Sequence, residues 1–187
     1  MENKLNKTKE CDLAVIGAGP AGLMAGFAAA SRGLRVVIIE KMNAPGRKLL
    51  ITGKGRCNVT NECGTEEFLG NIRNGARFMY SSLYAFDSFA VMEFFETHGV
   101  PLKTERGNRV FPQSDCAADI RDALVGAAKK AGCRFISGRA VKVETDESGV
   151  NAVILEDKTR VSCRAAVIAT GGLSYPKTGS TGDGYSL

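Results

Sequence analysis

Three glycines and one carboxylate stand at a spacing that suits the binding of phosphate and sugar. Gly17, Gly19 and Gly22 follow the pattern G-x-G-x-x-G, and Glu40 lies about twenty residues further on. In this pattern the first glycine permits a tight turn, the second lets the backbone approach a pyrophosphate, and the third lets a helix pack closely against a strand. Glu40 can accept hydrogen bonds from both hydroxyls of a ribose but disfavours a 2′-phosphate. The four residues therefore predict a dinucleotide site that does not take NADP.

A complete strand–helix–strand unit surrounds these residues and would position them. Residues 13–16 form a short apolar run typical of a buried strand, and an alanine-rich stretch predicts a helix to about Ser31. Gly33 ends that helix, and residues 34–40 predict a second strand with Glu40 at its tip. Free N–H groups at the start of the helix favour a phosphate. A G-x-G-x-x-G pattern alone is weak evidence, but within this unit it is specific.

A second glycine-rich stretch, GKGRCNVTN at residues 53–61, admits four interpretations. A kinase-type phosphate loop fails because Lys54 is followed by a glycine instead of a serine or threonine. A zinc knuckle fails because Cys57 and Cys63 stand alone in a chain with one histidine. The glycosylation sequon at Asn58 is discounted because no export signal precedes it.

The remaining interpretation is one wall of a bound cofactor. Glycines let main-chain N–H groups point at a ligand, and the Asn58 amide can both donate and accept hydrogen bonds. Four cations could neutralise a pyrophosphate: Arg47, Lys48, Lys54 and Arg56. An exposed basic loop stays open as the alternative. Cys57 is expected to be a small loop residue and not a redox thiol.

The composition is that of an ordinary globular protein. The chain has 187 residues, of which 44% are apolar and 24% charged, and a formal net charge of +5. No apolar run approaches the roughly 20 residues that cross a bilayer, and the charged start lacks the apolar stretch of a signal peptide. We therefore expect a cytoplasmic protein with reduced cysteines and with residues 1–10 as a disordered lead-in. The positive charge is spread along the sequence, which argues against a nucleic-acid partner.

Short helices are expected in the middle of the chain. Residues 41–61 show no regular period, and Thr65 is expected to cap a short helix. Apolar residues at helical spacing between residues 76 and 98 predict two helices broken near Asp87. Their apolar stripe is interpreted as core.

The last third of the chain is expected to be rich in strands. A hairpin with residues 107–108 at its tip should precede a helix over residues 116–130 that is capped by Asp115. A β-meander is predicted over residues 133–163. A buried strand that runs into two glycines is predicted over residues 165–172.

Several longer motifs resemble a known family. GAGPAGLMAG with IIEK is similar to the FAD-binding start of flavoproteins with two dinucleotide-binding domains. GRKLLITGKGRCNVTN, ERGNRVFPQS and VIATGGLSYPKTGSTGDGYSL resemble bacterial FAD-dependent oxidoreductases of the aminoacetone-oxidase-like family. That family includes a 3-dehydro-bile-acid Δ4,6-reductase, and the resemblance covers about residues 11–187.

The resemblance implies a Rossmann-like α/β domain of the three-layer β-β-α type, with a β-meander and with FAD as its cofactor. Family members are longer, so residues 11–187 are expected to be an incomplete FAD-binding domain, with a substrate domain starting near residues 175–187. NAD(P)H would be an electron donor, a small molecule the substrate, and neither nucleic acid, membrane nor metal a partner.

The implied reaction is flavin-mediated hydride transfer to the C=C bond of an enone. The alternatives are an amine oxidase that uses oxygen, an inactive FAD-binding fragment and, more remotely, an RNA-modifying flavoprotein.

The resemblance also implies which residues contact the cofactor. Val141 should meet adenine through its backbone, and residues 174–181 should lie near the flavin. Tyr175 and Arg56 are candidate donors to a substrate carbonyl, but no catalytic residue is identified. The expected cofactor-binding residues are Gly17, Ala18, Gly19, Pro20, Ala21, Gly22, Glu40, Lys41, Arg47, Lys48, Gly53, Gly55, Arg56, Cys57, Asn58, Val141, Ala169, Thr170, Gly171 and Gly172.

Overall fold

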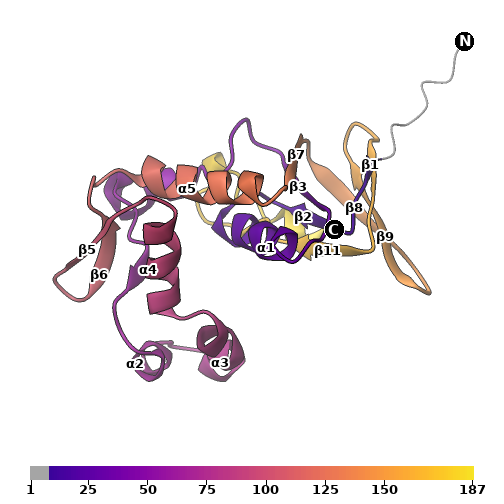
Figure 1. Ribbon diagram of the computed structural model, residues 1–187. Helices are drawn as coiled ribbons and strands as arrows, with labels where there is room; N and C mark the ends of the chain where they lie inside the picture. Colours follow the sequence, from indigo (N-terminus) through magenta and orange to yellow (C-terminus); the bar gives the residue numbers. More distant parts are fainter. Residues whose placement is uncertain (1–8) are drawn as a thin grey trace, which may run out of the picture. The chain divides into compact units, whose positions relative to one another are not determined.

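The computed structural model describes residues 9–187, which form two compact units (Figure 1). Of the described residues, one unit contains residues 9–48 and 124–187, and the other contains Leu49–Ala123. Residues 1–8 of the expected lead-in lie outside the described residues, whereas Lys9–Glu10 form a short strand, β1. In sequence, the second unit is therefore an insertion into the first.

The first unit is built on a parallel sheet. Its strand order is β11-β2-β3-β7, and every neighbouring pair is parallel. The strands are β2 (Leu13–Ile16), β3 (Val36–Glu40), β7 (Arg134–Ser137) and β11 (Ala165–Ile168). Helix α1 (Pro20–Ala30) connects β2 to β3, which confirms the predicted strand–helix–strand unit. The prediction of β7 as part of the meander was wrong, because a four-residue strand does not reveal from sequence which sheet it joins.

Alternate side chains of the parallel sheet contact two different layers. Val37 and Ile39 belong to one hydrophobic cluster with the buried residues of a second sheet. Ile38 lies on the helix side, where a Cβ added to Gly26 of α1 would be 2.7 Å from Ile38 Cδ1. Neighbouring side chains on a strand point to opposite faces, so strands cover one face and α1 covers the other. The first unit has the three-layer β-β-α architecture that the family resemblance implies.

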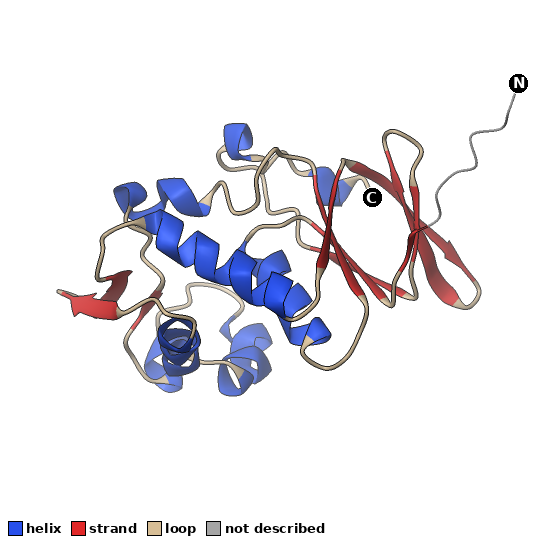
Figure 2. Cartoon of the chain, turned by 45° about the horizontal axis from the view of Figure 1, so that its top comes forward, coloured by secondary structure: helices blue, strands red, loops and turns tan. Residues whose placement is uncertain are grey.

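The second sheet of this unit contains the predicted meander. Its strand order is β1-β10-β9-β8, in which β1 joins β10 in parallel and the other pairs are antiparallel. The meander strands are β8 (Ala140–Asp146), β9 (Gly149–Leu155) and β10 (Arg160–Ser162). The register shifts between Ala140 and Lys142, so Val141 stands at a β-bulge. Figure 2 shows the strands in red and the connecting loops in tan.

The second unit combines short helices with a small antiparallel sheet. The sheet order is β4-β6-β5, from β4 (Thr60–Asn61), β5 (Leu102–Glu105) and β6 (Arg109–Pro112). The predicted hairpin is present as β5 and β6, with Gly107 and Asn108 in its turn. The helices are the 3-10 helix η1 (Leu49–Gly55), α2 (Thr65–Gly70), α3 (Ala76–Ala85) and α4 (Ser88–Thr97). The boundary between the two units falls within α5 (Ala117–Lys130).

Three local expectations for the second unit need correction. η1 and β4 occupy part of the stretch that was expected to lack regular structure. Thr65 is the first residue of α2 and Gly64 is the N-cap, without a side-chain cap. Asp115 does not cap α5, because its carboxylate is held by ion pairs with Lys103 and Arg56. The predicted break at Asp87 is confirmed, since its Oδ1 accepts a 2.8 Å hydrogen bond from a backbone N–H of α4.

The apolar stripe of α3 and α4 is core only in part. Leu83 and Phe95 are buried, whereas Phe78 is 87% and Phe89 50% exposed. Helical spacing identifies which residues share a face, but it does not show how much of that face is covered.

Residues 9–187 contain neither a candidate membrane span nor a candidate metal site. No helix there is long and apolar enough to cross a membrane. In the same range, no group of three or more His, Cys, Asp or Glu side chains is placed to hold a metal ion.

Candidate dinucleotide-binding site

The first unit contains a cavity of about 540 Å³ at the carboxyl ends of β2, β3 and β11. Ligands of open α/β sheets bind at this edge, where the loops after the strands meet. The cavity is lined by Gly17, Gly19, Pro20, Ala21, Glu40, Ala44, Gly46, Arg47, Lys48, Ile168, Ala169, Thr170, Gly171, Thr178, Gly179, Ser180, Gly184 and Tyr185. Its volume lies within the roughly 300–1,000 Å³ typical of small-molecule sites.

The three motif glycines differ in what surrounds them. Gly17 has a φ of +105°, and a Cβ there would lie 2.5 Å from the carbonyl oxygen of Ala169. A Cβ on Gly22 would lie 1.9 Å from the carbonyl oxygen of Gly17. A Cβ on Gly19 would have no neighbouring atom within 4 Å, and Gly19 lines the cavity. Gly17 and Gly22 are therefore required by the fold, whereas Gly19 keeps open a space that a ligand could fill.

The start of α1 faces this space as a potential anion site. Gly19 is the N-cap of the helix and Pro20 its first residue, and no side chain caps the helix. The N–H groups of the first turn and the positive end of the helix dipole favour a phosphate. The 11 residues of α1 make the dipole substantial.

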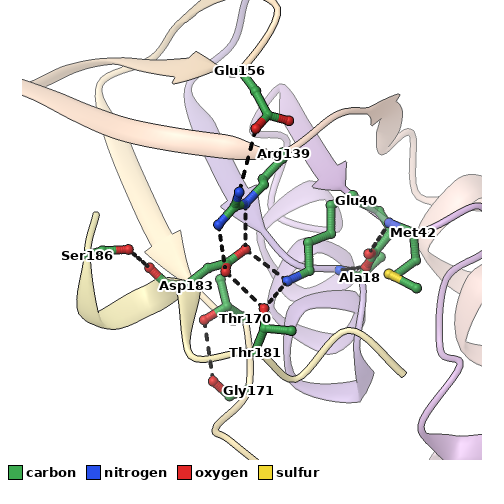
Figure 3. A network of polar contacts seen from close by, with 11 residues as sticks. Ala18, Glu40, Met42, Arg139, Glu156, Thr170, Gly171, Thr181, Asp183 and Ser186 are labelled. Atoms are coloured by element: carbon green, nitrogen blue, oxygen red, sulfur yellow. Dashed lines mark hydrogen bonds and ion pairs between the residues drawn. The ribbon is translucent and has the colours of Figure 1, made fainter. Parts of the chain in front are cut away.

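Glu40 is held rigidly at the cavity wall (Figure 3). Its Oε2 accepts a 2.8 Å hydrogen bond from the N–H of Ala18, and its Oε1 accepts one of 2.8 Å from the N–H of Met42. A carboxylate oxygen has two lone pairs, so each oxygen can still accept a hydrogen bond from a ligand. The anchored carboxylate can thus receive two neighbouring hydroxyl groups, as the sequence predicts for a ribose.

The basic residues after β3 divide into two groups. Arg47 and Lys48 line the cavity, and Lys48 Nζ donates to Ser174 Oγ at 2.8 Å. Lys41, which was expected to contact the cofactor, does not line this cavity, because its ammonium pairs with Asp183 at 2.8 Å. Lys41 lines instead a small neighbouring cavity of about 30 Å³.

The far wall comes from the segment after β11. Ala169, Thr170 and Gly171 line the cavity as expected, but Gly172 does not. Val141 does not line it either and is 42% exposed. The sequence analysis missed Ala44, Gly46, Ile168, Gly184 and Tyr185 as lining residues. The rule that loops after parallel strands meet at one edge could have found Ala44, Gly46 and Ile168.

The expected wall formed by Gly53, Gly55, Arg56, Cys57 and Asn58 belongs to the second unit. Gly53 and Gly55 have positive φ angles of 54° and 88°, which glycine adopts without strain. Cys57 is only 2% exposed, and burial raises the pKa of its thiol, as suits a packed loop residue. The Asn58 amide nitrogen is placed to donate to the Thr60 carbonyl at 3.1 Å. The role of these residues at a cofactor stays a prediction.

Arg56 has internal partners that the sequence did not suggest. Its guanidinium pairs with Glu105, pairs with Asp115 at 2.8 Å, and lies 4.2 Å from the ring centroid of Phe111. Hydrogen bonds from Lys103 and Arg56 in turn lower the pKa of Asp115. With two carboxylates opposite it, Arg56 ties the loop to β5 and to the segment just before α5, and its expected role near a phosphate stays a prediction.

The parallel sheet and the glycine-rich cavity at its carboxyl edge define a Rossmann-type dinucleotide-binding domain. Residues 11–187 match the family described as HI0933-like protein Rossmann domain, and the chain belongs to this family.

The curated relatives are considerably longer than this chain. A ribosomal RNA dihydrouridine synthase of Escherichia coli is 33% identical over 94% of this chain and 43% of its own length. A 3-dehydro-bile acid delta(4,6)-reductase of Clostridium scindens is 33% identical over 94% of this chain and 42% of its own length. This chain therefore spans less than half of the length of these relatives.

Solved structures support the fold. A 3-ketosteroid-delta4-(5alpha)-dehydrogenase from Rhodococcus jostii matches with a TM-score of 0.69 over 92% of this chain and 48% of that chain, at 18% identity. A flavocytochrome c3 fumarate reductase matches with a TM-score of 0.59 over 88% of this chain and 34% of that chain, at 20% identity. At such low identity these matches establish the architecture alone.

Proposed function

We propose that this chain binds FAD and belongs to a flavoprotein that reduces a carbon–carbon double bond conjugated with a carbonyl group. The observation that carries the cofactor assignment is the Glu40 carboxylate, anchored by two backbone N–H groups beside the uncapped start of α1. An acceptor for ribose hydroxyls and a donor site for phosphates thus lie in one cavity, as the ADP half of FAD requires.

The residues present fit this cofactor. The open space at Gly19 and the N–H groups of the first turn of α1 would hold the phosphates, and Glu40 would hold the ribose. Arg47 and Lys48 would balance the pyrophosphate charge. Val141 stands at a bulge, outside regular ladder pairing, where its backbone would be free to meet adenine. When bound, the flavin supplies the redox chemistry and the protein supplies binding and orientation.

The reaction class is supported by two relatives with different substrates. The names dihydrouridine synthase and delta(4,6)-reductase both denote the addition of hydrogen across carbon–carbon double bonds. Each match extends over 94% of this chain, which supports double-bond reduction as the proposed reaction class. The first candidate substrate is a small steroid-like enone. Tyr175, 65% exposed after β11, remains a candidate donor to its carbonyl, whereas the paired guanidinium of Arg56 is a poor one.

RNA is the second candidate substrate, because two relatives are named ribosomal RNA dihydrouridine synthase. The folded first unit also gathers positive charge that the sequence analysis took to be spread. Three exposed arginines lie at the starts of parallel strands: Arg35 before β3, Arg134 at β7 and Arg164 before β11. Three more exposed cations lie at the ends of helices: Arg32 after α1, and Lys129 and Lys130 in α5. Asp12 neutralises part of this cluster through Arg35 and Arg164. This edge is opposite the cavity, so a long polyanion would be needed to reach both.

A reoxidation experiment would separate these candidates. The chain would be loaded with FAD, photoreduced without oxygen and mixed with a steroid enone, with a uridine-containing RNA, or with dissolved oxygen. We expect the absorbance of oxidised flavin to return with the enone, or with the RNA if the second candidate holds. Reoxidation by oxygen alone would contradict a double-bond reductase and favour the amine oxidase alternative.

A further inference from the structure

We propose that Asp183 is a positioning residue that holds Glu40 in place for a ribose, acting through Lys41. The inference rests on the proposed function, because it assumes that Glu40 receives the ribose of a bound adenine nucleotide. Asp183 belongs to none of the cofactor-contacting residues predicted from the sequence, and it does not line the main cavity.

Asp183 is a buried carboxylate with several donors (Figure 3). Its side chain is 9% exposed, and among the described residues the buried polar side chains otherwise belong to Ser88 and Ser180. Its Oδ2 accepts from Lys41 Nζ at 2.8 Å, and its Oδ1 accepts from Thr181 Oγ1 at 2.9 Å. Arg139 adds a longer contact of 3.3 Å from Nη2. A buried charge with this many partners is fixed in position.

The carboxylate stays ionised under ordinary conditions. Burial opposes its ionisation, but hydrogen bonds from Lys41, Arg139 and Thr181 outweigh burial and lower the pKa of Asp183 to about 2. The ion pair with Lys41 is therefore formed at neutral pH, and it is a fixed support and not a pH switch.

The link to the cavity is the end of β3. Glu40 is the last residue of β3, and Lys41 follows it directly in the chain. Glu40 is tied to the N–H groups of Ala18 and Met42, and Lys41 is tied to Asp183. The backbone between the two side chains is thus held from both sides. The N–H of Gly138 also donates to the carbonyl oxygen of Glu40 at 2.9 Å, so the backbone of the strand end is held as well. Without the Lys41 pair, this strand end loses its side-chain attachment to Asp183.

The segment that carries Asp183 also packs closely against the cavity wall. A Cβ on Gly184 would lie 2.6 Å from Thr170 Oγ1, and a Cβ on Gly182 would lie 2.5 Å from Leu173 Cδ2. Gly184 and Thr170 both line the main cavity. Asp183 is therefore connected through Gly184 to the cavity wall, and a local shift of Asp183 would displace that wall.

The test compares ADP with 2′,3′-dideoxy-ADP, which lacks both hydroxyls that Glu40 would receive. Titration calorimetry on the 187-residue chain gives the ratio of the two dissociation constants. One charge-assisted hydrogen bond is worth about 1.5 kcal/mol, so we expect wild type to prefer ADP about tenfold or more. Asp183→Asn and Lys41→Met should each reduce this preference to about threefold or less. Glu40→Ala should abolish it and so gives the lower limit.

Glu156→Gln is the matched control. Glu156 belongs to the same network but contacts Arg139 at 3.5 Å and is 67% exposed at its side chain. It should keep the wild-type preference for ADP. Circular dichroism establishes whether each variant is folded. If Asp183→Asn does not fold, Lys41→Met tests the same ion pair.

The outcomes separate the inference from the function on which it rests. A wild-type chain that binds ADP and dideoxy-ADP equally would contradict the ribose contact of Glu40 and hence the proposed cofactor site. A wild-type preference for ADP that persists undiminished in folded Asp183→Asn and Lys41→Met would overturn the positioning role. In that case a parallel loss of affinity for both nucleotides would indicate a purely structural role for Asp183.

Discussion

Replacing two glycines of one motif should have opposite effects on folding and binding. The backbone of Gly19 has φ −75° and ψ 178°, which any residue can adopt, and a Cβ there meets no atom within 4 Å. Gly19→Val should therefore fold, at a cost of about 1 kcal/mol for a poor N-cap residue. Gly22→Ala places its Cβ 1.9 Å from the carbonyl oxygen of Gly17. That clash should destabilise the apoprotein by about 3 kcal/mol or more.

The binding effect of Gly19→Val follows from the space that it fills. The valine side chain would occupy the place where the backbone should approach the pyrophosphate. Losing two charge-assisted hydrogen bonds of about 1.5 kcal/mol each removes about 3 kcal/mol, which weakens FAD binding roughly 100-fold.

The assay pairs urea denaturation of the apoprotein with FAD titration followed by fluorescence. Gly19→Val should give a denaturation curve near that of wild type together with the weakened affinity. Gly22→Ala should instead lower the free energy of unfolding of the apoprotein strongly. Wild-type FAD affinity in a folded Gly19→Val variant would refute the assignment of the phosphate site to the start of α1.

Three further predictions concern charge and thiols. The pKa of Asp183 falls from 3.8 to about 2 on folding, so its contribution to stability is complete above about pH 4 and is lost between pH 4 and pH 2. Acid denaturation of Asp183→Asn should lack that portion of the pH dependence. Arg56→Lys keeps the charge but loses the planar fork between two carboxylates, so its thermal midpoint should fall, whereas exposed Arg106→Lys should leave it unchanged. A thiol reagent should modify exposed Cys116 well before Cys57, which is 2% exposed; faster labelling of Cys57 would mean that its loop opens.

The features predicted well from sequence are those fixed by nearby residues. The strand–helix–strand unit around Gly17, Gly19 and Gly22 needs only a short stretch of chain, and its periodicity and turns agree with one another. The helix break at Asp87 and the turn at Asn108 are also local, because a few residues determine the backbone there.

The features missed depend on partners far apart in sequence. Lys41 was expected at the cofactor from the family resemblance, but its ammonium is held by Asp183, 142 residues later. Arg56 was assigned to phosphate because it lies in a glycine-rich loop, but it pairs with Glu105, 49 residues later. A cation in sequence shows only that a charge is present. Which carboxylate it meets is decided by the tertiary fold.

Long-range packing also explains why the sequence did not show which sheet a strand joins or which residues line a cavity. Strand β7 was placed in the meander by its position in the chain, yet it pairs with β3. Tyr185 was not recognised as a lining residue, because it reaches the cavity through a turn near the end of the sequence. Period-two patterns identify strands, but the sheet that a strand joins depends on long-range packing.

The central claim is that this chain binds FAD through the cavity of its first unit. The most direct test is an absorbance spectrum of the purified chain after incubation with FAD and removal of free ligand, with the released cofactor identified by chromatography against FAD, FMN and NAD. The account predicts FAD near one equivalent per chain, and a large loss of it in Gly19→Val. A folded wild-type chain that stays colourless after incubation with FAD would contradict the account.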